Sequence, residues 1–232
     1  MENNMPNQLH MDMDVLPNPY FDPASPNGET WGRLRVHIVT ENEDILLLDK
    51  EWNLDEPIEW FVSHRSDLCH ELPPRFEGIQ APTPAESIAR YLDRCWATGA
   101  ELEGQALEVW MDEFREPIRL YRERHALSRA MKGSGVPTIT IGCNHGMGEI
   151  SLSPDEEDLG SKQPWTLRHT GDWSYSFHMW DFWDRFYKDA KTYLREWLQS
   201  STDPPTQNTA RRLLLLLSRS VDETSCCNSE EL

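Results

Sequence analysis

The segment 181–199 restricts the possible folds of this chain more than any other stretch, because it carries one wide apolar face. Large side chains recur there at intervals of three and four residues. This is the period of an amphipathic α-helix that buries one side. The face consists of Trp180, Trp183, Tyr187, Ala190, Leu194 and Trp197. Such a helix needs a sheet or other helices against it, and Asp181 is expected to cap its start.

A β-hairpin is predicted near the beginning of the chain. Residues 33–40 alternate apolar and polar side chains, which is typical of a half-buried strand. The acidic stretch 41–44 is a plausible turn, and residues 45–52 are more apolar, as in a more buried strand. The two strands and the short turn between them therefore predict an antiparallel hairpin.

Helical patterns follow over 57–71, 83–96 and 103–131. Thr83 opens a capping box, so the second helix is expected to start there. Pro117 lies inside the apolar stripe of the third pattern, and a proline removes a helix hydrogen bond and clashes with the preceding turn. The third helix is therefore expected to kink or break near Phe114.

The periodicity then changes from helical to alternating. Four short strands are predicted at 137–143, 148–153, 165–170 and 173–178, with tight turns at 144–147 and 171–172. An antiparallel meander of four strands is the simplest arrangement of these segments.

Together the patterns predict one α+β domain over about residues 31–199, with an N-terminal β-hairpin, a helical middle, a four-stranded antiparallel sheet and a closing aromatic helix. Residues 1–30 are rich in Pro, Asn and Asp and predict a disordered acidic arm, with Tyr20 and Phe21 able to anchor it. Residues 200–232 predict a flexible tail that contains a short helix over 210–219.

The charge balance excludes some classes of function. The chain has 40 Asp and Glu against 22 Lys and Arg, which gives a formal net charge of −18. Binding of nucleic acid needs clustered cations that neutralise phosphates, so this composition argues against it. The same charge repels anionic membranes and attracts a basic protein partner.

The chain shows no segment typical of export or of membrane insertion. Its N-terminus lacks a basic and then apolar signal region, and the apolar run Leu213–Leu217 is far shorter than the about 20 residues of a membrane span. The cysteines match no disulfide framework or zinc pattern; they are Cys69, Cys95, Cys143, Cys226 and Cys227. Reduced thiols, a cytoplasmic location and no cofactor are expected. Oligomeric state is left open.

The stretch IGCNHGMGEIS, residues 141–151, contains residue types found in phosphate loops and metal sites. Its G-x-G pattern precedes a predicted strand, whereas a phosphate loop precedes a helix whose free N–H groups face the anion. Cys143 and His145 could begin a zinc site, but no third ligand has a suitable spacing. A hairpin turn with a buried cysteine is favoured, with His145 and Glu149 unassigned.

The stretch YRERHALSR, residues 121–129, is the densest cationic segment. Arg122 and Arg124 are expected to pair with carboxylates of the same chain, and anion binding is the alternative. His125 lies on the apolar stripe of the predicted helix. A core histidine that is hydrogen-bonded through one ring nitrogen is favoured over a general base.

Acidic side chains are concentrated near the N-terminus and in one loop. Residues 1–60 hold 13 Asp and Glu against 3 Lys and Arg, and the loop 155–158 reads DEED. Such charges are explained by a requirement for solubility. The alternative is a binding surface that attracts a basic protein electrostatically. The residues expected to contact this partner are Glu41, Glu43, Asp44, Asp155, Glu156, Glu157 and Asp158.

Three stretches together resemble an uncharacterised family of bacterial domains of the conflict or immunity type. They are WNLDEPIEWF (52–61) with LCHELPP (68–74), then YRERHALSRAMKGSGVP (121–137), then GEIS (148–151). The resemblance spans about residues 31–200 and implies no catalytic residues. The residues that the resemblance marks as part of the family's sequence pattern are Trp52, Trp60, Glu71, Arg124, His125 and Glu149.

Two hypotheses of function follow. The first is a non-enzymatic, acidic, immunity-like protein that recognises or neutralises a basic partner such as a nuclease toxin. The alternative is an enzyme, metal-dependent in one version, whose pocket is built from Arg124, His125, Cys143, His145 and Glu149. The second hypothesis requires these side chains to converge.

Overall fold

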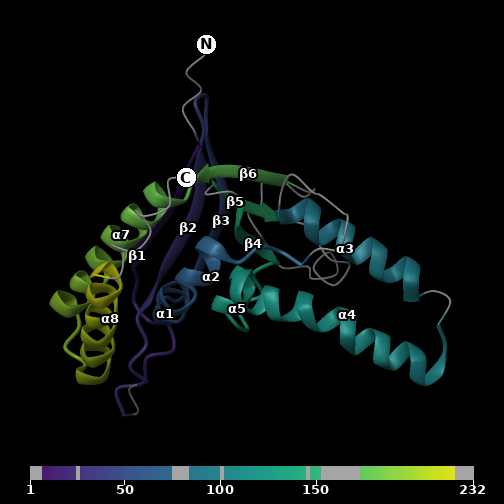
Figure 1. Cartoon of the computed structure of the whole chain (residues 1–232). Helices are drawn as coiled ribbons and strands as arrows, with labels where there is room; N and C mark the ends of the chain where they lie inside the picture. The colour runs from purple at the N-terminus through teal and green to yellow at the C-terminus, as the bar shows by residue number, and fades with distance from the viewer. Residues whose placement is uncertain are drawn as a thin grey trace. The chain divides into compact units, whose positions relative to one another are not determined.

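The computed structural model describes residues 7–24, 27–74, 84–99, 102–144, 147–152 and 173–222. Over these residues the chain is α+β, with two three-stranded antiparallel sheets (Figure 1). It divides into two compact units. Among the described residues, unit 1 comprises Asn7, 64–152 and 173–179, and unit 2 comprises 8–63 and 180–222. The single domain predicted over 31–199 stays a prediction, and each unit is described by itself.

The sheet of unit 2 contains the predicted hairpin and one further strand. Its strands are β1 (Gln8–Val15), β2 (Trp31–Val39) and β3 (Asp44–Asn53), in the order β1-β2-β3. The hairpin of β2 and β3 is confirmed. The disordered arm is wrong for residues 8–15, because β1 pairs with the other edge of β2. Leu9 and Met11 alternate with polar residues and are buried, so β1 contributes to the core.

The closing aromatic helix is confirmed as α7 (Met179–Ser200), which belongs to unit 2 from Trp180 onward. Its rings pack on α1 (Asp55–Ser63), where Phe61 lies 4.9 Å from Phe186 between ring centroids. Two details differ from prediction. The helix begins two residues before Asp181, which therefore lies in the first turn, and Trp180 is 47% exposed.

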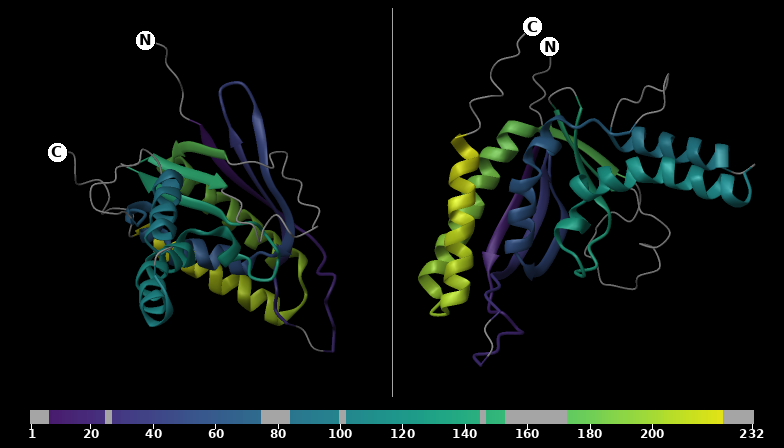
Figure 2. Two further views of the ribbon diagram at one scale, coloured as in Figure 1. Left: turned by 90° about the vertical axis from the view of Figure 1, so that its right-hand side faces the viewer. Right: turned by 60° about the horizontal axis from the view of Figure 1, so that its bottom comes forward.

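The predicted short C-terminal helix is much longer in the structure. Helix α8 (Pro204–Asp222) runs beside α7 in unit 2 (Figure 2). Asp203 accepts a hydrogen bond from the Thr206 N–H at 2.9 Å, which caps the start of the helix. Ala210, Leu213 and Leu217 are fully buried at helical spacing. Residues 204–222 are therefore a packed element rather than a flexible tail.

Unit 1 begins with a helical part. Its helices are α2 (Arg65–His70), α3 (Pro84–Gly99), α4 (Gly104–His125) and α5 (Leu127–Ala130). The helix predicted over 57–71 is divided at His64 into α1 and α2. The helix predicted over 103–131 continues through Pro117 and ends at His125, so the predicted break is wrong.

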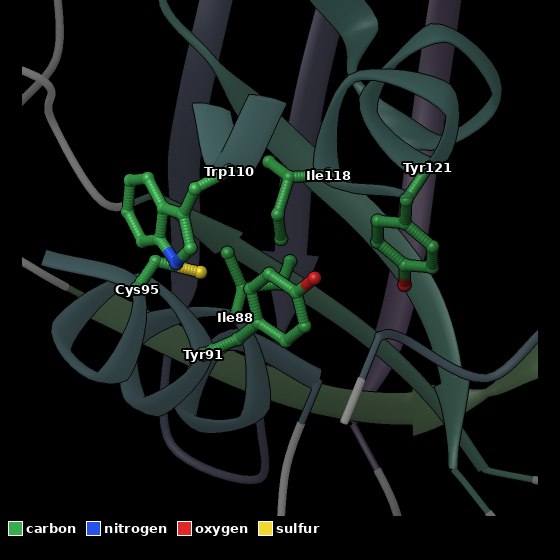
Figure 3. Close-up of a cluster of buried hydrophobic side chains, with 6 residues drawn as sticks. All are labelled: Ile88, Tyr91, Cys95, Trp110, Ile118 and Tyr121. Carbon is green, nitrogen blue, oxygen red and sulfur yellow. The ribbon is translucent and has the colours of Figure 1, made fainter. Parts of the chain in front are cut away.

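Helices α3 and α4 pack through a small apolar cluster, drawn in Figure 3. The cluster contains Ile88, Tyr91, Cys95, Trp110, Ile118 and Tyr121. A side chain at Gly99 would clash with the Trp110 ring, because an added Cβ would lie 2.6 Å from it. The end of α3 is therefore packed directly against the Trp110 ring of α4.

The sheet of unit 1 has three strands among the described residues, and the predicted four-stranded meander is wrong. The strands are β4 (Ile139–Asn144), β5 (Met147–Leu152) and β6 (Trp173–His178), in the order β4-β5-β6. Glu149 of β5 lies opposite Gly142 on one side and Ser176 on the other. Both edges of β5 are thus occupied, so no strand can lie between β5 and β6. The predicted strand 165–170 falls outside the described residues.

Candidate functional site

The end of α4 brings polar side chains onto strand β4. An isolated bridge pairs Ala126 with Thr140, so the chain after α4 runs against β4. Arg124 and His125 follow Tyr121 on α4 by three and four residues, which places each of them on the side of the helix that carries Tyr121. The candidate site of unit 1 is built on these three side chains.

Arg124 is held by a bidentate ion pair with Glu71, the residue that follows α2. The Arg124 Nε donates to Glu71 Oε2 at 2.7 Å, and a terminal N–H donates to Oε1. Burial acts to raise the pKa of Glu71, but hydrogen bonds from Arg124 and His125 outweigh it and hold the pKa below its ordinary value. The fork of the guanidinium is therefore occupied by the chain's own carboxylate.

His125 is completely buried and uses both ring nitrogens. Its Nδ1 donates to the carbonyl oxygen of Ile141 at 2.7 Å, since a carbonyl can only accept. Its Nε2 lies 3.1 Å from Glu71 Oε2, and this contact needs one proton between the two atoms. Burial lowers the pKa of His125, and the bonds to Ile141 and Glu71 oppose that effect. The sequence predicted a hydrogen bond through one ring nitrogen, and the structure shows a polar partner for each of the two. Neither nitrogen is therefore free to act as a base.

Tyr121 extends the cluster toward β5. Its ring stacks on His125 with 3.8 Å between centroids and 7° between planes. Its hydroxyl occupies the space above Gly142, where an added Cβ would lie 2.6 Å from it. Among the described residues this buried hydroxyl has no hydrogen-bond partner. Gly142 thus leaves room for a phenol that points at the face of the sheet.

Glu149 lies on the same face of the sheet as that hydroxyl, because it is directly opposite Gly142 in the β4–β5 ladder. The residue is only 3% exposed. Burial, together with the nearby carboxylates of Glu71 and Glu149, raises the pKa of Tyr121 far above its ordinary value. Tyr121 is therefore a neutral phenol, able to donate a hydrogen bond.

Four of the five residues of the predicted enzyme pocket lie in this region: Arg124, His125, Cys143 and Glu149. His145 is outside the described residues. Sequence reasoning did not assign a site role to Tyr121. Glu71 entered only through the family resemblance, since no spacing rule connects it to Arg124, which is 53 residues away.

Neither a metal site nor an anion site is supported by the geometry. In the part of the chain that the structure describes, no three His, Cys, Asp or Glu side chains are placed to hold a metal ion. Cys143 is a buried cysteine of β4. Arg124 already binds Glu71, and anion binding by Arg122, which is half-buried on α4, stays a prediction. None of the described helices is long and apolar enough to cross a membrane.

The acidic residues predicted to contact a partner are placed in part. Glu41 and Glu43 are exposed on the turn between β2 and β3. The Thr40 hydroxyl accepts the N–H of Glu43 at 3.1 Å, which fixes the turn. Asp44 is different, because its carboxylate lies 2.7 Å from Nδ1 of His37. The loop from Asp155 to Asp158 falls outside the described residues.

Most of the arginines that the structure describes are neutralised within the chain. Eight of them have a nitrogen within 3.8 Å of a carboxylate oxygen of their own unit: Arg33, Arg35, Arg90, Arg119, Arg124, Arg129, Arg185 and Arg212. The predicted pairing of arginines with the chain's own carboxylates is confirmed for Arg124.

Comparison of the chain with protein-family models, with curated proteins and with solved structures gave no match. The resemblance to bacterial conflict or immunity domains therefore stays a prediction, and function is inferred from the geometry alone.

Proposed function

We propose that this chain is a non-enzymatic acidic protein that binds a basic protein partner and neutralises it, as an immunity protein does with a nuclease toxin. The observation that supports this most directly is the internal pairing of the arginines. Each pair cancels one positive and one negative charge, and the chain still has 40 acidic against 22 basic residues. The remaining field is strongly negative and attracts a basic partner.

The turn between β2 and β3 is the part of unit 2 that we propose the basic partner contacts first. Glu41 and Glu43 are exposed, and the hydrogen bonds of Thr40 keep their backbone in one conformation. A fixed turn loses little conformational entropy when a partner binds. Asp44 is already bonded to His37, so it contributes less to the surface. Asp155, Glu156, Glu157 and Asp158 remain part of the proposal.

The test is capture of a partner by the purified, immobilised chain from a lysate of its source cells. A basic protein is expected, whose association slows steeply as sodium chloride is added, because salt screens the exposed charges. Failure to capture any partner, or a partner whose affinity does not depend on salt, would contradict the proposal.

A pair of charge-reversal variants locates the surface. Replacing Glu41 and Glu43 by lysine is expected to slow association about tenfold or more. The matched control replaces Glu108 and Glu113, two exposed acids on α4, by lysine with the same change in net charge. Equal loss in both variants would mean that total charge matters and the turn does not.

A second candidate function is a small-molecule site at Tyr121 and Glu149 of unit 1, favoured by the buried hydroxyl of Tyr121. The neutral phenol would donate a hydrogen bond to a bound polar group, and the Glu149 carboxylate would accept one. His125 would position Tyr121 by stacking on it, since both of its ring nitrogens are engaged.

A thermal-shift screen of small polar metabolites tests this second candidate, with metal analysis of the purified protein as a first check of the metal-dependent version. A true ligand is expected to stabilise the wild type and to lose its effect with Tyr121→Phe and Glu149→Gln. The Glu116→Gln variant, changed at an exposed α4 position, serves as control. A ligand that binds all variants equally would remove this candidate.

A further inference from the structure

Three aromatic rings of unit 2 stand in a row at one end of its sheet. Tyr20, in the segment between β1 and β2, lies 5.4 Å from Trp31 between ring centroids, with the rings nearly perpendicular. Trp31, the first residue of β2, lies 5.9 Å from Trp52 of β3. The predicted anchoring of the N-terminal segment by Tyr20 is thus visible as its contact with Trp31.

The row begins at the surface and extends into the unit. Tyr20 is 73% exposed and the adjacent Phe21 is 47% exposed, whereas Trp31 is only 8% exposed. Trp52 is half-buried. Exposed tyrosine and tryptophan rings backed by a buried ring are the usual anchors of protein interfaces.

Two carboxylates are fixed beside the row. At one end, Glu56 accepts a hydrogen bond from the indole Nε1–H of Trp52 at 3.0 Å. At the other end, Glu29 accepts one from the Asn18 side-chain nitrogen at 3.1 Å. The Asn18 oxygen in turn accepts the Tyr20 N–H at 2.8 Å. Asn18 therefore holds Tyr20 and Glu29 together. The rings and the carboxylates form one surface whose geometry is fixed by hydrogen bonds.

We propose that this aromatic–acidic row, Tyr20, Trp31 and Trp52 with Glu29 and Glu56, binds an arginine side chain of a basic partner segment. The faces of aromatic rings attract cations, and a guanidinium can stack on a ring while it donates to a carboxylate. An anion would be repelled by Glu29 and Glu56. An apolar group would remove water from these carboxylates without supplying a positive charge, which costs free energy.

This inference rests on the proposed function and adds to it the chemical group that is recognised. The acidic turn at Glu41 and Glu43 acts on association at long range. The row is a short-range contact, so its loss should raise the dissociation rate while the association rate changes little.

The probe is a short synthetic peptide of alternating arginine and glycine, and its control is the same peptide with citrulline in place of arginine. Citrulline keeps the shape of the side chain and removes its charge. Titration of the full ¹⁵N-labelled chain is expected to move the indole signals of Trp52 and Trp31 with the arginine peptide. The citrulline peptide should leave both signals in place.

Substitutions distinguish binding by the aromatic–acidic row from non-specific electrostatic attraction to the acidic chain. Tyr20→Ala and Glu56→Gln are each expected to lower the affinity for the arginine peptide about tenfold. Trp180→Ala, at another exposed aromatic position, should leave this affinity unchanged. Because Tyr20 is exposed, its substitution should leave the fold intact, which circular dichroism checks. If the peptide binds with salt dependence and Tyr20→Ala binds as wild type, the row is excluded while the electrostatic proposal stands. If no basic partner is captured at any salt concentration, the proposed function itself fails.

Discussion

The Nε2 atom of His125 lies 3.1 Å from Oε2 of Glu71, although the two residues are 54 positions apart in the chain. This contact connects the end of α4 to the segment after α2, and the bond from Nδ1 to Ile141 connects the same ring to β4. One imidazole therefore joins three elements of unit 1. Its position argues for a role in holding the unit together.

Glu71→Ala is expected to destabilise unit 1 by roughly 2–3 kcal/mol, because the variant leaves a buried imidazole nitrogen and a half-buried guanidinium without their polar partner. Urea unfolding measured by circular dichroism checks this. Glu116→Ala, which breaks the exposed Glu116–Arg119 pair on α4, is the control and should change stability little. Similar losses of unfolding free energy in both variants would show that the buried network stabilises the unit no more than an exposed ion pair does.

The pH dependence of this network has a defined sign. The folded-state pKa of Glu71 is below its ordinary value of 4.5, so its stabilisation is present above that value and is lost as the pH falls through the folded pKa. The Glu71→Gln variant should therefore lose less stability than the wild type when the pH is lowered from neutrality below 4.5. Parallel curves for the two proteins would contradict the assignment.

Gly142→Ala is expected to destabilise unit 1 by about 1–3 kcal/mol, because the new Cβ would lie 2.6 Å from the Tyr121 hydroxyl. Tyr121→Phe removes that hydroxyl and should restore much of the loss. A double-mutant cycle of these two substitutions, followed by thermal or urea unfolding, measures the coupling. Additive effects would mean that the backbone, not the hydroxyl, limits position 142.

Two buried tyrosines should respond differently to the same substitution. The Tyr193 hydroxyl donates to the Thr30 carbonyl at 2.6 Å, so Tyr193→Phe is expected to cost about 1–2 kcal/mol. The Tyr121 hydroxyl has no partner among the described residues, so Tyr121→Phe should be nearly neutral. Unfolding of both variants under one condition makes the comparison. A large loss with Tyr121→Phe would reveal a hydrogen bond to this hydroxyl.

Asp55, the first residue of α1, should make unit 2 less stable as the pH rises. Burial raises its folded-state pKa from 3.8 to about 6. A raised carboxyl pKa gives stability that is complete below the unfolded value and is lost as the pH rises through the folded value. The loss between pH 4 and pH 7 is up to roughly 3 kcal/mol.

The Asp55→Asn variant tests this dependence, because an amide does not titrate. Its stability relative to the wild type should increase between pH 4 and pH 7 in urea-unfolding experiments at both values. Asp22→Asn, at an exposed position, is the control. An unchanged difference between Asp55→Asn and the wild type at the two pH values would show that Asp55 stays ionised in the fold.

Much of the secondary structure could be predicted because it depends on local periodicity. The aromatic stripe of 181–199 identified α7, and alternation identified the β2–β3 hairpin and strand β6. Strand β1 was missed because the abundance of Pro, Asn and Asp in residues 1–30 concealed the alternation around Leu9 and Met11. The meander was wrong because strand order depends on which edges pair, and β5 pairs with β6 directly.

The sequence by itself determined the α+β class, the positions of most helices and strands, and the excess of negative charge. It also placed His125 on a buried stripe, because helical spacing defines one face. The tertiary structure alone decided that Glu71 binds both Arg124 and His125, that Tyr121 faces Gly142 beside Glu149, and that Tyr20, Trp31 and Trp52 stand in a row. These contacts join residues far apart in the chain, and they depend on how the elements pack, which no local pattern encodes.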